Sequence, residues 1–281
     1  LPISVPFRTS LSPCPKMTEA ISLETMNGFI DLADRAADAA GVVLSHYFRS
    51  AALSVETKGD LSPVTKADRE AEIAIRALIE DAYPDHGILG EEFDSVNIDA
   101  EFVWVLDPID GTKSFITGKP LFGTLIALAQ NGVPILGLIN QPILSERWAG
   151  VAGKESTFNG KPARVRKCKS IDRAILYATS PHMFVGKDAE AFARVCDHVQ
   201  HPLYGGDCYA YGLLASGHTD LIVEADLKPY DFAALVPIVE GAGGIITDWE
   251  GAPLTIASGP RVVAAGDPDI HAQALELLRD N

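Results

Sequence analysis

Trp104-Val-Leu-Asp-Pro-Ile-Asp-Gly-Thr112 is an apolar run that ends in two acids, with a glycine and a threonine directly after them. The proline fixes its own φ and the glycine permits a sharp turn. At the end of a strand, Asp107 and Asp110 can converge on one point while the carbonyl of Ile109 faces the same way. Hard cations prefer such oxygen ligands, and Mg²⁺ usually keeps water and substrate oxygens as its remaining ligands. The stretch therefore predicts a Mg²⁺ site centred on these residues.

Two other segments place acids where strands or helices begin or end. Glu91 and Glu92 follow the strand-like run Gly87–Leu89, and Asp231 lies where a helix begins, at an end whose dipole favours anions. Taken alone, D-x-x-D would more simply be a tight acidic turn, and Asp231 a helix N-cap. Acids at the ends of two strands and at the start of a helix, all in one α/β chain, instead favour a metal centre.

Other chemistries have weaker support in the sequence. The seven histidines form neither H-E-x-x-H nor H-x-H, so a zinc site is disfavoured. No G-x-S-x-G elbow occurs, which argues against an α/β-hydrolase serine. Gly111–Pro120 resembles a P-loop, but six residues rather than four separate its glycines. D-x-x-D also differs from the D-x-D of aspartyl-phosphate phosphatases, which counts against a covalent aspartate nucleophile.

Composition limits the partners and the compartment. With 38 Asp and Glu against 23 Lys and Arg the net charge is −15, so neither nucleic acid nor an anionic membrane is expected as a partner. The four cysteines are scattered, which fits a reducing, cytoplasmic compartment, and no apolar run is long enough to span a membrane. Residues 1–16 are rich in Ser and Pro. We expect a disordered extension there, with the remnant of a plastid transit peptide as the alternative.

The chain begins with helices and continues with a meander of strands. Apolar residues recur at helical spacing over Leu23–Phe48, and a second helix starts near Thr65 and ends before Pro84. A hairpin turn is expected at Asn131-Gly132. The strands expected in this part are Phe102–Leu106, Thr124–Gln130, Pro134–Asn140 and Arg147–Ala152.

After Lys169 strands and helices alternate. Strands are expected at Ala174–Thr179, Asp220–Glu224, Gly244–Asp248 and Arg261–Ala265, and helices at Asp188–Val199, Tyr209–Ser216, Asp231–Glu240 and Pro268–Leu278. This order predicts a layered α/β fold over residues 17–281, with two subdomains that divide near Lys169.

Three motifs in order resemble the inositol monophosphatase superfamily. Its pattern is W-x-x-D-P-I-D-G-T after G-E-E and before W/Y-D-x-A-A, and the matching segments are Trp104–Thr112, Gly90–Glu92 and Tyr230–Ala234. The resemblance implies a layered αβαβα fold, a homodimer, and a Mg²⁺-dependent phosphatase site between the two halves of the chain.

The resemblance also implies a set of metal ligands. Glu91, Asp107 and the carbonyl of Ile109 would hold one Mg²⁺, and Asp107, Asp110 and Asp231 a second. A third, weaker ion would share Glu91, so two or three ions are expected in each active site.

The catalytic roles follow from the same resemblance. Glu91 and Thr112 would orient and deprotonate a water nucleophile that a metal activates. Asp110 is catalytic through the second ion, which would stabilise the leaving alkoxide. The backbone N–H groups of Gly111 and Thr112 would cradle the phosphate.

One segment departs from the superfamily pattern. Where the family often has D-x-V-T-x-x-D, this chain has Ser62-Pro-Val-Thr-Lys-Ala-Asp68. The family's first Asp supports the water-activating threonine, and Ser62 could accept the same hydrogen bond. Thr65 and Asp68 have an equally good interpretation as a helix cap.

The departure coincides with features of the histidinol-phosphate phosphatase branch. That branch has S-P-V-T-x-A-D, D-G-T-K-S-F-I-T-G-K-P and L-K-P-Y-D, all present here. The substrate it implies carries an ammonium and an imidazole, which acids would bind through charge-assisted hydrogen bonds. Asp207 and Glu224 are the candidate acids, with Gly206 and Asp231 beside the substrate, although Asp207 could also be a helix cap and Glu224 an ordinary acid at the end of a strand.

Three hypotheses therefore remain. The first is Mg²⁺-dependent hydrolysis of L-histidinol phosphate to L-histidinol and phosphate, in histidine biosynthesis. The second is an inositol- or broad-specificity sugar-phosphate phosphatase. The third is a non-catalytic protein that uses the acids only as a structural Ca²⁺ site or as a binding module. Such a protein would have no need of Glu91 or Thr112, and both are present.

Overall fold

The computed structural model describes residues 21–51, 53–57 and 63–279. The expectations for residues 1–16 and for Ser62 lie outside these ranges. Within the described residues, no helix combines the length and the apolar character that crossing a bilayer would require.

A seven-stranded sheet forms the first half of the chain. Its strand order is β3-β4-β5-β6-β7-β8-β9, and its pairs are antiparallel except for β3 and β4. The strands are β3 (Gly87–Gly90), β4 (Phe102–Asp110), β5 (Gly123–Gln130), β6 (Val133–Gln141), β7 (Glu146–Val151), β8 (Thr157–Phe158) and β9 (Lys161–Pro162). The hairpin turn between β5 and β6 has positive φ at Asn131 and Gly132, as the Asn-Gly pair predicts.

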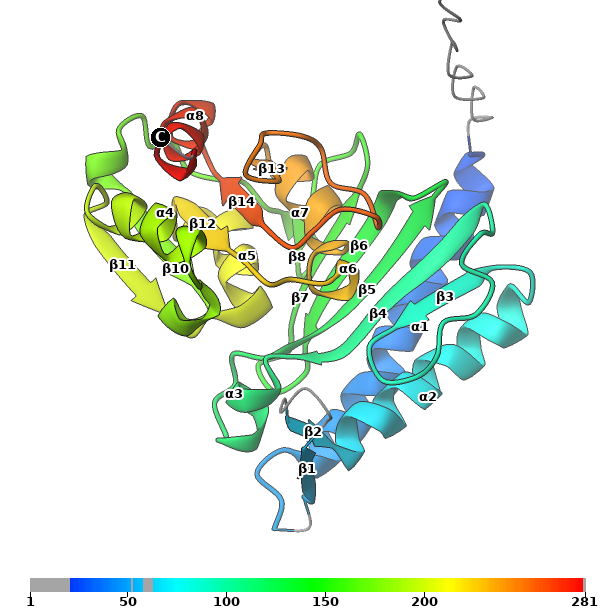
Figure 1. Ribbon diagram of the computed structural model, residues 1–281. Coiled ribbons are helices and arrows are strands. Elements are labelled where there is room, and N and C mark those ends of the chain that lie inside the picture. The colour runs from blue at the N-terminus through cyan, green and yellow to red at the C-terminus, as the bar shows by residue number, and fades with distance from the viewer. Residues whose placement is uncertain (1–20, 52, 58–62, 280–281) are drawn as a thin grey trace, which may run out of the picture.

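Two long helices cover one face of this sheet (Figure 1). They are α1 (Leu23–Tyr47) and α2 (Lys66–Ala82), and their apolar faces pack on β4, β5 and β6. The predicted cap of α2 is confirmed, because the Thr65 side chain accepts from the backbone of Ala67 and Asp68. A short hairpin, β1 (Val55–Thr57) and β2 (Pro63–Thr65), joins the two helices.

A second sheet of five strands follows, in the order β11-β10-β12-β14-β13. Its strands are β10 (Ile175–Ala178), β11 (His201–Tyr204), β12 (Leu221–Glu224), β13 (Ile245–Thr247) and β14 (Val262–Ala265). The helices α5 (Asp207–Ala215), α6 (Pro229–Phe232) and α7 (Leu235–Gly241) lie between the two sheets, and α4 (Lys187–Cys196) and α8 (Pro268–Leu278) lie on the outer side (Figure 1). The layers are therefore αβαβα, as expected.

Several elements differ from the sequence-based expectation. The single helix expected at Asp231–Glu240 is two helices, α6 and α7. Pro237 explains the break, because it has no N–H to donate to the carbonyl of Ala233. The helix expected at Asp188–Val199 ends at Cys196, and the one expected from Tyr209 begins at Asp207. The short helix α3 (Thr112–Ile116) and the exposed edge strand β11 were not expected.

Candidate active site

The acids at the end of β4 converge because the strand is irregular there. In a regular strand, residues 107 and 110 would point to opposite faces of the sheet, since side chains alternate. The pairing of β4 with β5 shifts register between Asp107 and Asp110, and such an irregularity re-aims side chains. The amide of Ile109 donates to Asp107 Oδ1 at 2.9 Å, which holds that carboxylate against the turn.

Asp231 completes a cluster with these two acids. Carboxylate oxygens of Asp107, Asp110 and Asp231 all lie within 4.8 Å of one another. Asp231 is the third residue of α6 and accepts from the Lys228 amide at 2.7 Å. It is therefore not the N-cap of that helix, which was the alternative interpretation.

The carboxylates of this cluster repel one another, and burial makes their charged forms still less favourable. Burial raises the pKa of Asp107 well above its usual range, and the charges of Glu91, Asp110 and Asp231 raise it further. Burial also raises the pKa of Asp231 to about 7. No lysine or arginine in the part of the chain described here forms an ion pair with Asp107, Asp110 or Asp231. Three converging carboxylates without a neutralising base are a donor set that fits a hard divalent cation.

The other predicted ligands, Glu91 and the carbonyl of Ile109, adjoin this cluster. Glu91 is half-buried at the end of β3, where its amide donates to the Leu106 carbonyl at 3.2 Å. Its charge raises the pKa of both Asp107 and Asp231, and its carboxyl group hydrogen-bonds with that of Asp107, although it is outside the set of three whose oxygens all lie within 4.8 Å of one another. The Thr112 hydroxyl donates to the carbonyl of Ile109 at 3.2 Å, so these two predicted site residues contact each other.

Thr65 and Asp68 form the cap that was one of their two interpretations. Asp68 Oδ2 accepts from the Thr65 amide at 2.7 Å and from its hydroxyl at 2.5 Å. Burial raises the pKa of Asp68 to about 6, although both bonds from Thr65 oppose the shift. Whether this segment supports Thr112 through Ser62 falls outside the described residues.

A small cavity joins the acidic cluster to the predicted substrate acids. Its volume is about 140 Å³, and it is lined by Asp110, Thr179, Met183, Asp207, Cys208, Tyr211, Glu224, Leu227 and Asp231. Asp207 and Glu224, chosen from sequence as the cation-binding acids, therefore face the same space as two acids of the cluster.

Asp207 is held by α3, the short helix that follows β4. Its Oδ2 accepts from the Ser114 hydroxyl at 2.7 Å, so its side chain does not cap α5, as one interpretation had it. Gly206 occupies the N-cap position of that helix. The backbone N–H of the next residue, Cys208, donates to Asp110 Oδ2 at 2.5 Å, which connects the start of α5 to the acidic cluster.

Glu224 lies at the end of β12 in a network of donors. It accepts from the Thr179 amide at 2.9 Å, from the Thr179 hydroxyl at 2.5 Å and from the Tyr211 hydroxyl at 2.9 Å. Burial raises the pKa of Glu224 to about 7 against the effect of these donors. Sequence reasoning missed Thr179 and Tyr211. The position of Thr179 at the end of an expected strand, parallel to the one that ends in Glu224, was the available signal.

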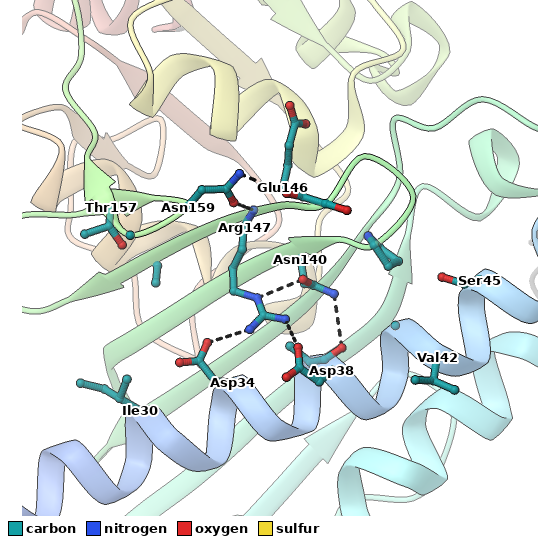
Figure 2. Close-up of a pocket in the computed structure, with 16 residues that line it drawn as sticks. Ile30, Asp34, Asp38, Val42, Ser45, Asn140, Glu146, Arg147, Thr157 and Asn159 are labelled. Carbon is teal, nitrogen blue, oxygen red and sulfur yellow. Dashed lines mark hydrogen bonds and ion pairs between the residues drawn. The ribbon is translucent and has the colours of Figure 1, made fainter.

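A larger cavity, of about 940 Å³, lies elsewhere, between α1 and strands β6 to β8. Figure 2 shows Arg147 at its centre, donating to Asp34 at 3.0 Å, to Asp38 at 2.5 Å and to Asn140 at 3.0 Å. None of the predicted site residues lines this cavity. Two of its carboxylates, Asp34 and Asp38, pair with Arg147, and the third, Glu146, accepts from the Tyr209 hydroxyl, so it is not the candidate site.

The comparison with protein families agrees with the geometry. The model described as "Inositol monophosphatase family" matches residues 26–281. The chain belongs to the inositol monophosphatase family. Enzymes of this family are generally metal-dependent and act on small phosphorylated substrates, and the acidic cluster offers such a metal site. The chain is therefore a phosphatase.

Individual relatives cover most of the chain. The bifunctional phosphatase IMPL2, chloroplastic, of Arabidopsis thaliana is 53% identical over 90% of this chain and 75% of its own. A histidinol-phosphatase of Chlorobaculum parvum is 36% identical over 85% of this chain and 92% of its own. A solved structure of an inositol monophosphatase from Zymomonas mobilis is 50% identical, covers 90% of this chain and 98% of that one, and has a TM-score of 0.82.

Proposed function

We propose that this phosphatase hydrolyses L-histidinol phosphate to L-histidinol and phosphate with Mg²⁺ as its cofactor. The observation that carries the proposal is the shared cavity, in which Asp207 and Glu224 face Asp110 and Asp231. A phosphate at the metal cluster would bring the rest of the substrate against two further acids. Two carboxylates can also accept from the hydroxyls of a neutral polyol, but they bind an ammonium and an imidazolium more strongly, because both partners of each hydrogen bond are then charged.

The proposed metal ligands follow the clustering of the acids. Asp107, Asp110 and Asp231 would hold one Mg²⁺, and Asp107 with Glu91 and the Ile109 carbonyl would hold another. The proximity of the three clustered carboxylates supports the first set, and the electrostatic effect of Glu91 on Asp107 supports the second. A third, weaker ion would share Glu91.

The residues of the chain have separate roles in the proposed reaction. The backbone N–H groups of Gly111 and Thr112 bind the phosphate, and Glu91 and Thr112 orient the attacking water and take its proton. As the water oxygen bonds to phosphorus, the bond from phosphorus to the ester oxygen breaks, and the leaving alkoxide takes up a proton. When bound, the divalent cations activate the water and offset the negative charge that the phosphoryl group carries.

The substrate acids recognise the cationic end of the ester. Asp207 and Glu224 accept hydrogen bonds from the ammonium and the imidazole, and the Thr179 and Tyr211 hydroxyls keep Glu224 in place. Gly206 and Asp231 lie beside the substrate in this arrangement. The histidinol-phosphatases of Chlorobaculum parvum and Mycobacterium tuberculosis, 36% and 34% identical to this chain, support the choice of substrate.

A substrate panel tests the proposal directly. Steady-state kcat/KM is measured for histidinol phosphate, inositol 1-phosphate and a neutral sugar phosphate, each with Mg²⁺ and with a chelator. We expect a preference for histidinol phosphate of at least about 100-fold, the scale of two charge-assisted contacts, and no turnover with the chelator.

The same panel separates the second candidate function. The Arabidopsis relative is named a bifunctional phosphatase and the Zymomonas protein an inositol monophosphatase, which favours activity on inositol phosphates as well. Equal or better turnover of inositol 1-phosphate would overturn the histidinol phosphate assignment and leave the metal-dependent chemistry in place. Turnover that persists with the chelator would overturn the metal assignment.

Assembly, subdomains and location are further parts of the proposal. We propose a homodimer, which size-exclusion chromatography with light scattering tests by measuring the mass in solution. We also propose two subdomains that divide near Lys169. The seven-stranded sheet ends at Pro162 and the other begins at Ile175, which supports the division. The sequence favours the cytoplasm, whereas the name of the Arabidopsis relative supports the plastid alternative. A fluorescent fusion of the whole chain in plant cells distinguishes the two.

A further inference from the structure

The Ser114 side chain has a single partner in the described part of the molecule, and that partner comes from the other half of the chain. Ser114 lies on α3 and is 4% exposed. Its hydroxyl donates to Asp207 Oδ2 at 2.7 Å, across 93 positions of sequence. A hydrogen bond from a neutral donor to a carboxylate is charge-assisted and therefore strong. Because α3 makes its backbone bonds without this hydroxyl, the contact serves Asp207 rather than the helix.

A second contact places the Asp207 carboxylate against the phosphate loop, by which we mean Gly111 and Thr112, whose backbone N–H groups are proposed to bind the phosphate. Gly111 has a φ of +87°, and a Cβ placed there would lie 2.9 Å from both Cγ and Oδ2 of Asp207. The carboxylate thus lies directly against Gly111, whose amide is proposed to bind the phosphate. Gly111 and Ser114 together set the distance between the phosphate position and this acid.

The contacts leave one oxygen of Asp207 for a ligand. Ser114 bonds to Oδ2, and Oδ1 accepts no hydrogen bond from the residues that the structure describes. Asp207 also lines the cavity next to Asp110. An ammonium on the carbon adjacent to the ester carbon would be close enough to the phosphate to donate to Oδ1.

We propose that Ser114 is a positioning residue that holds Asp207 against the phosphate loop, so that the enzyme selects phosphate esters with an ammonium group adjacent to the ester carbon. This inference rests on the proposed function, and it deepens it by assigning the ammonium to Asp207 and its alignment to Ser114. Glu224, at the end of β12, then binds the imidazole at the far end of the substrate.

The test compares histidinol phosphate with its desamino analogue, 3-(imidazolyl)propyl phosphate, which lacks only the ammonium. In Ser114→Ala we expect KM for histidinol phosphate to rise about tenfold with kcat little changed, the scale of one hydrogen bond to a charged group. KM for the desamino analogue should stay the same. Thr117→Val is the matched control, since it removes a hydroxyl from the end of the same helix that donates only to backbone carbonyls.

A double-mutant cycle separates positioning from a general structural effect. If Ser114 acts through Asp207, the variant carrying both Ser114→Ala and Asp207→Asn should discriminate between the two esters no worse than Asp207→Asn alone. Additive losses, or an equal rise in KM for both esters in Ser114→Ala, would overturn the inference. Ser114→Cys, nearly isosteric but a weak donor, gives the same comparison if the alanine variant does not fold.

The wild-type enzyme distinguishes this inference from the function on which it rests. A wild type that does not prefer histidinol phosphate over inositol 1-phosphate contradicts the proposed function. If the wild type prefers histidinol phosphate and both Ser114→Ala and Ser114→Cys keep that preference, the proposed function stands and only the role of Ser114 is contradicted.

Discussion

The seven-stranded sheet contacts two groups of carboxylates that differ in what neutralises them. At the end of β4, Asp107, Asp110 and Asp231 converge with no base paired to them in the described residues. On the side covered by α1, Asp34 and Asp38 both pair with Arg147.

The difference makes the first group the candidate metal site and the second a structural contact. Asp34 and Asp38 are 47% and 71% exposed, so water and a guanidinium together satisfy them. Asp107 is 2% exposed, and burial and neighbouring acids raise its pKa. Buried like charges oppose folding unless a cation from outside offsets them. The sequence contains 38 acids, and what distinguishes Asp107, Asp110 and Asp231 is that their carboxylates converge without a base paired to them in the described residues.

Removing one acid from each group should give the largest contrast. We expect Asp107→Asn to reduce kcat at least about 100-fold with the fold retained, the scale of a lost electrostatic contribution to catalysis. Asp34→Asn is the control and should leave kcat within about twofold, because Asp34 lies outside the site. Circular dichroism checks the fold. Full activity in Asp107→Asn would show that the cluster does not take part in the reaction.

Stability without metal should depend on pH in a defined direction. The pKa of Asp231 is raised from 3.8 to about 7 in the folded state, so folding favours its protonated form. Its ionisation costs no stability below about pH 4, and the cost grows until about pH 7. We therefore expect the melting temperature with chelator to fall over this range, and Mg²⁺ to raise it more at about pH 8 than at about pH 5.

The control for that measurement is Asp107→Asn without metal. Removing one of the converging charges should make the metal-free protein more stable than the wild type at about pH 8, while abolishing most of the stabilisation by Mg²⁺. A metal-induced shift that is independent of pH, or unchanged in the variant, would contradict the assignment of these acids as ligands.

Breaking the Arg147 group should have the smallest effect. Arg147→Ala removes three hydrogen bonds between β7 and its neighbours, two of them to exposed acids, and should lower the free energy of unfolding by about 1 kcal/mol. Activity per folded molecule should be unchanged. Arg164→Ala is the matched control, because its pair with Glu155 is exposed and should contribute close to nothing. Denaturant titration gives both values, and a large loss of kcat in Arg147→Ala would show that the two regions are coupled.

Much of the fold was predictable from local patterns. Apolar spacing located α1 and α2, and Thr65 with Asp68 located the cap between the hairpin and α2. The Asn131-Gly132 turn was predictable because only a few residue types adopt positive φ easily. Elements that depend on distant partners were harder, and β11 was missed because it is an exposed edge strand stabilised by β10 alone.

The same division holds within the candidate site. The sequence by itself determined which acids could bind metal, since Asp107, Asp110, Glu91 and Asp231 lie in short motifs whose order is sufficient to recognise the family. Only the tertiary structure decided how these acids meet, through the register shift in β4 and the placement of α6. It also decided the partners of the substrate acids, Ser114 for Asp207 and Thr179 with Tyr211 for Glu224. A motif records neighbours along the chain, whereas a hydrogen bond across 93 residues depends on how whole layers pack.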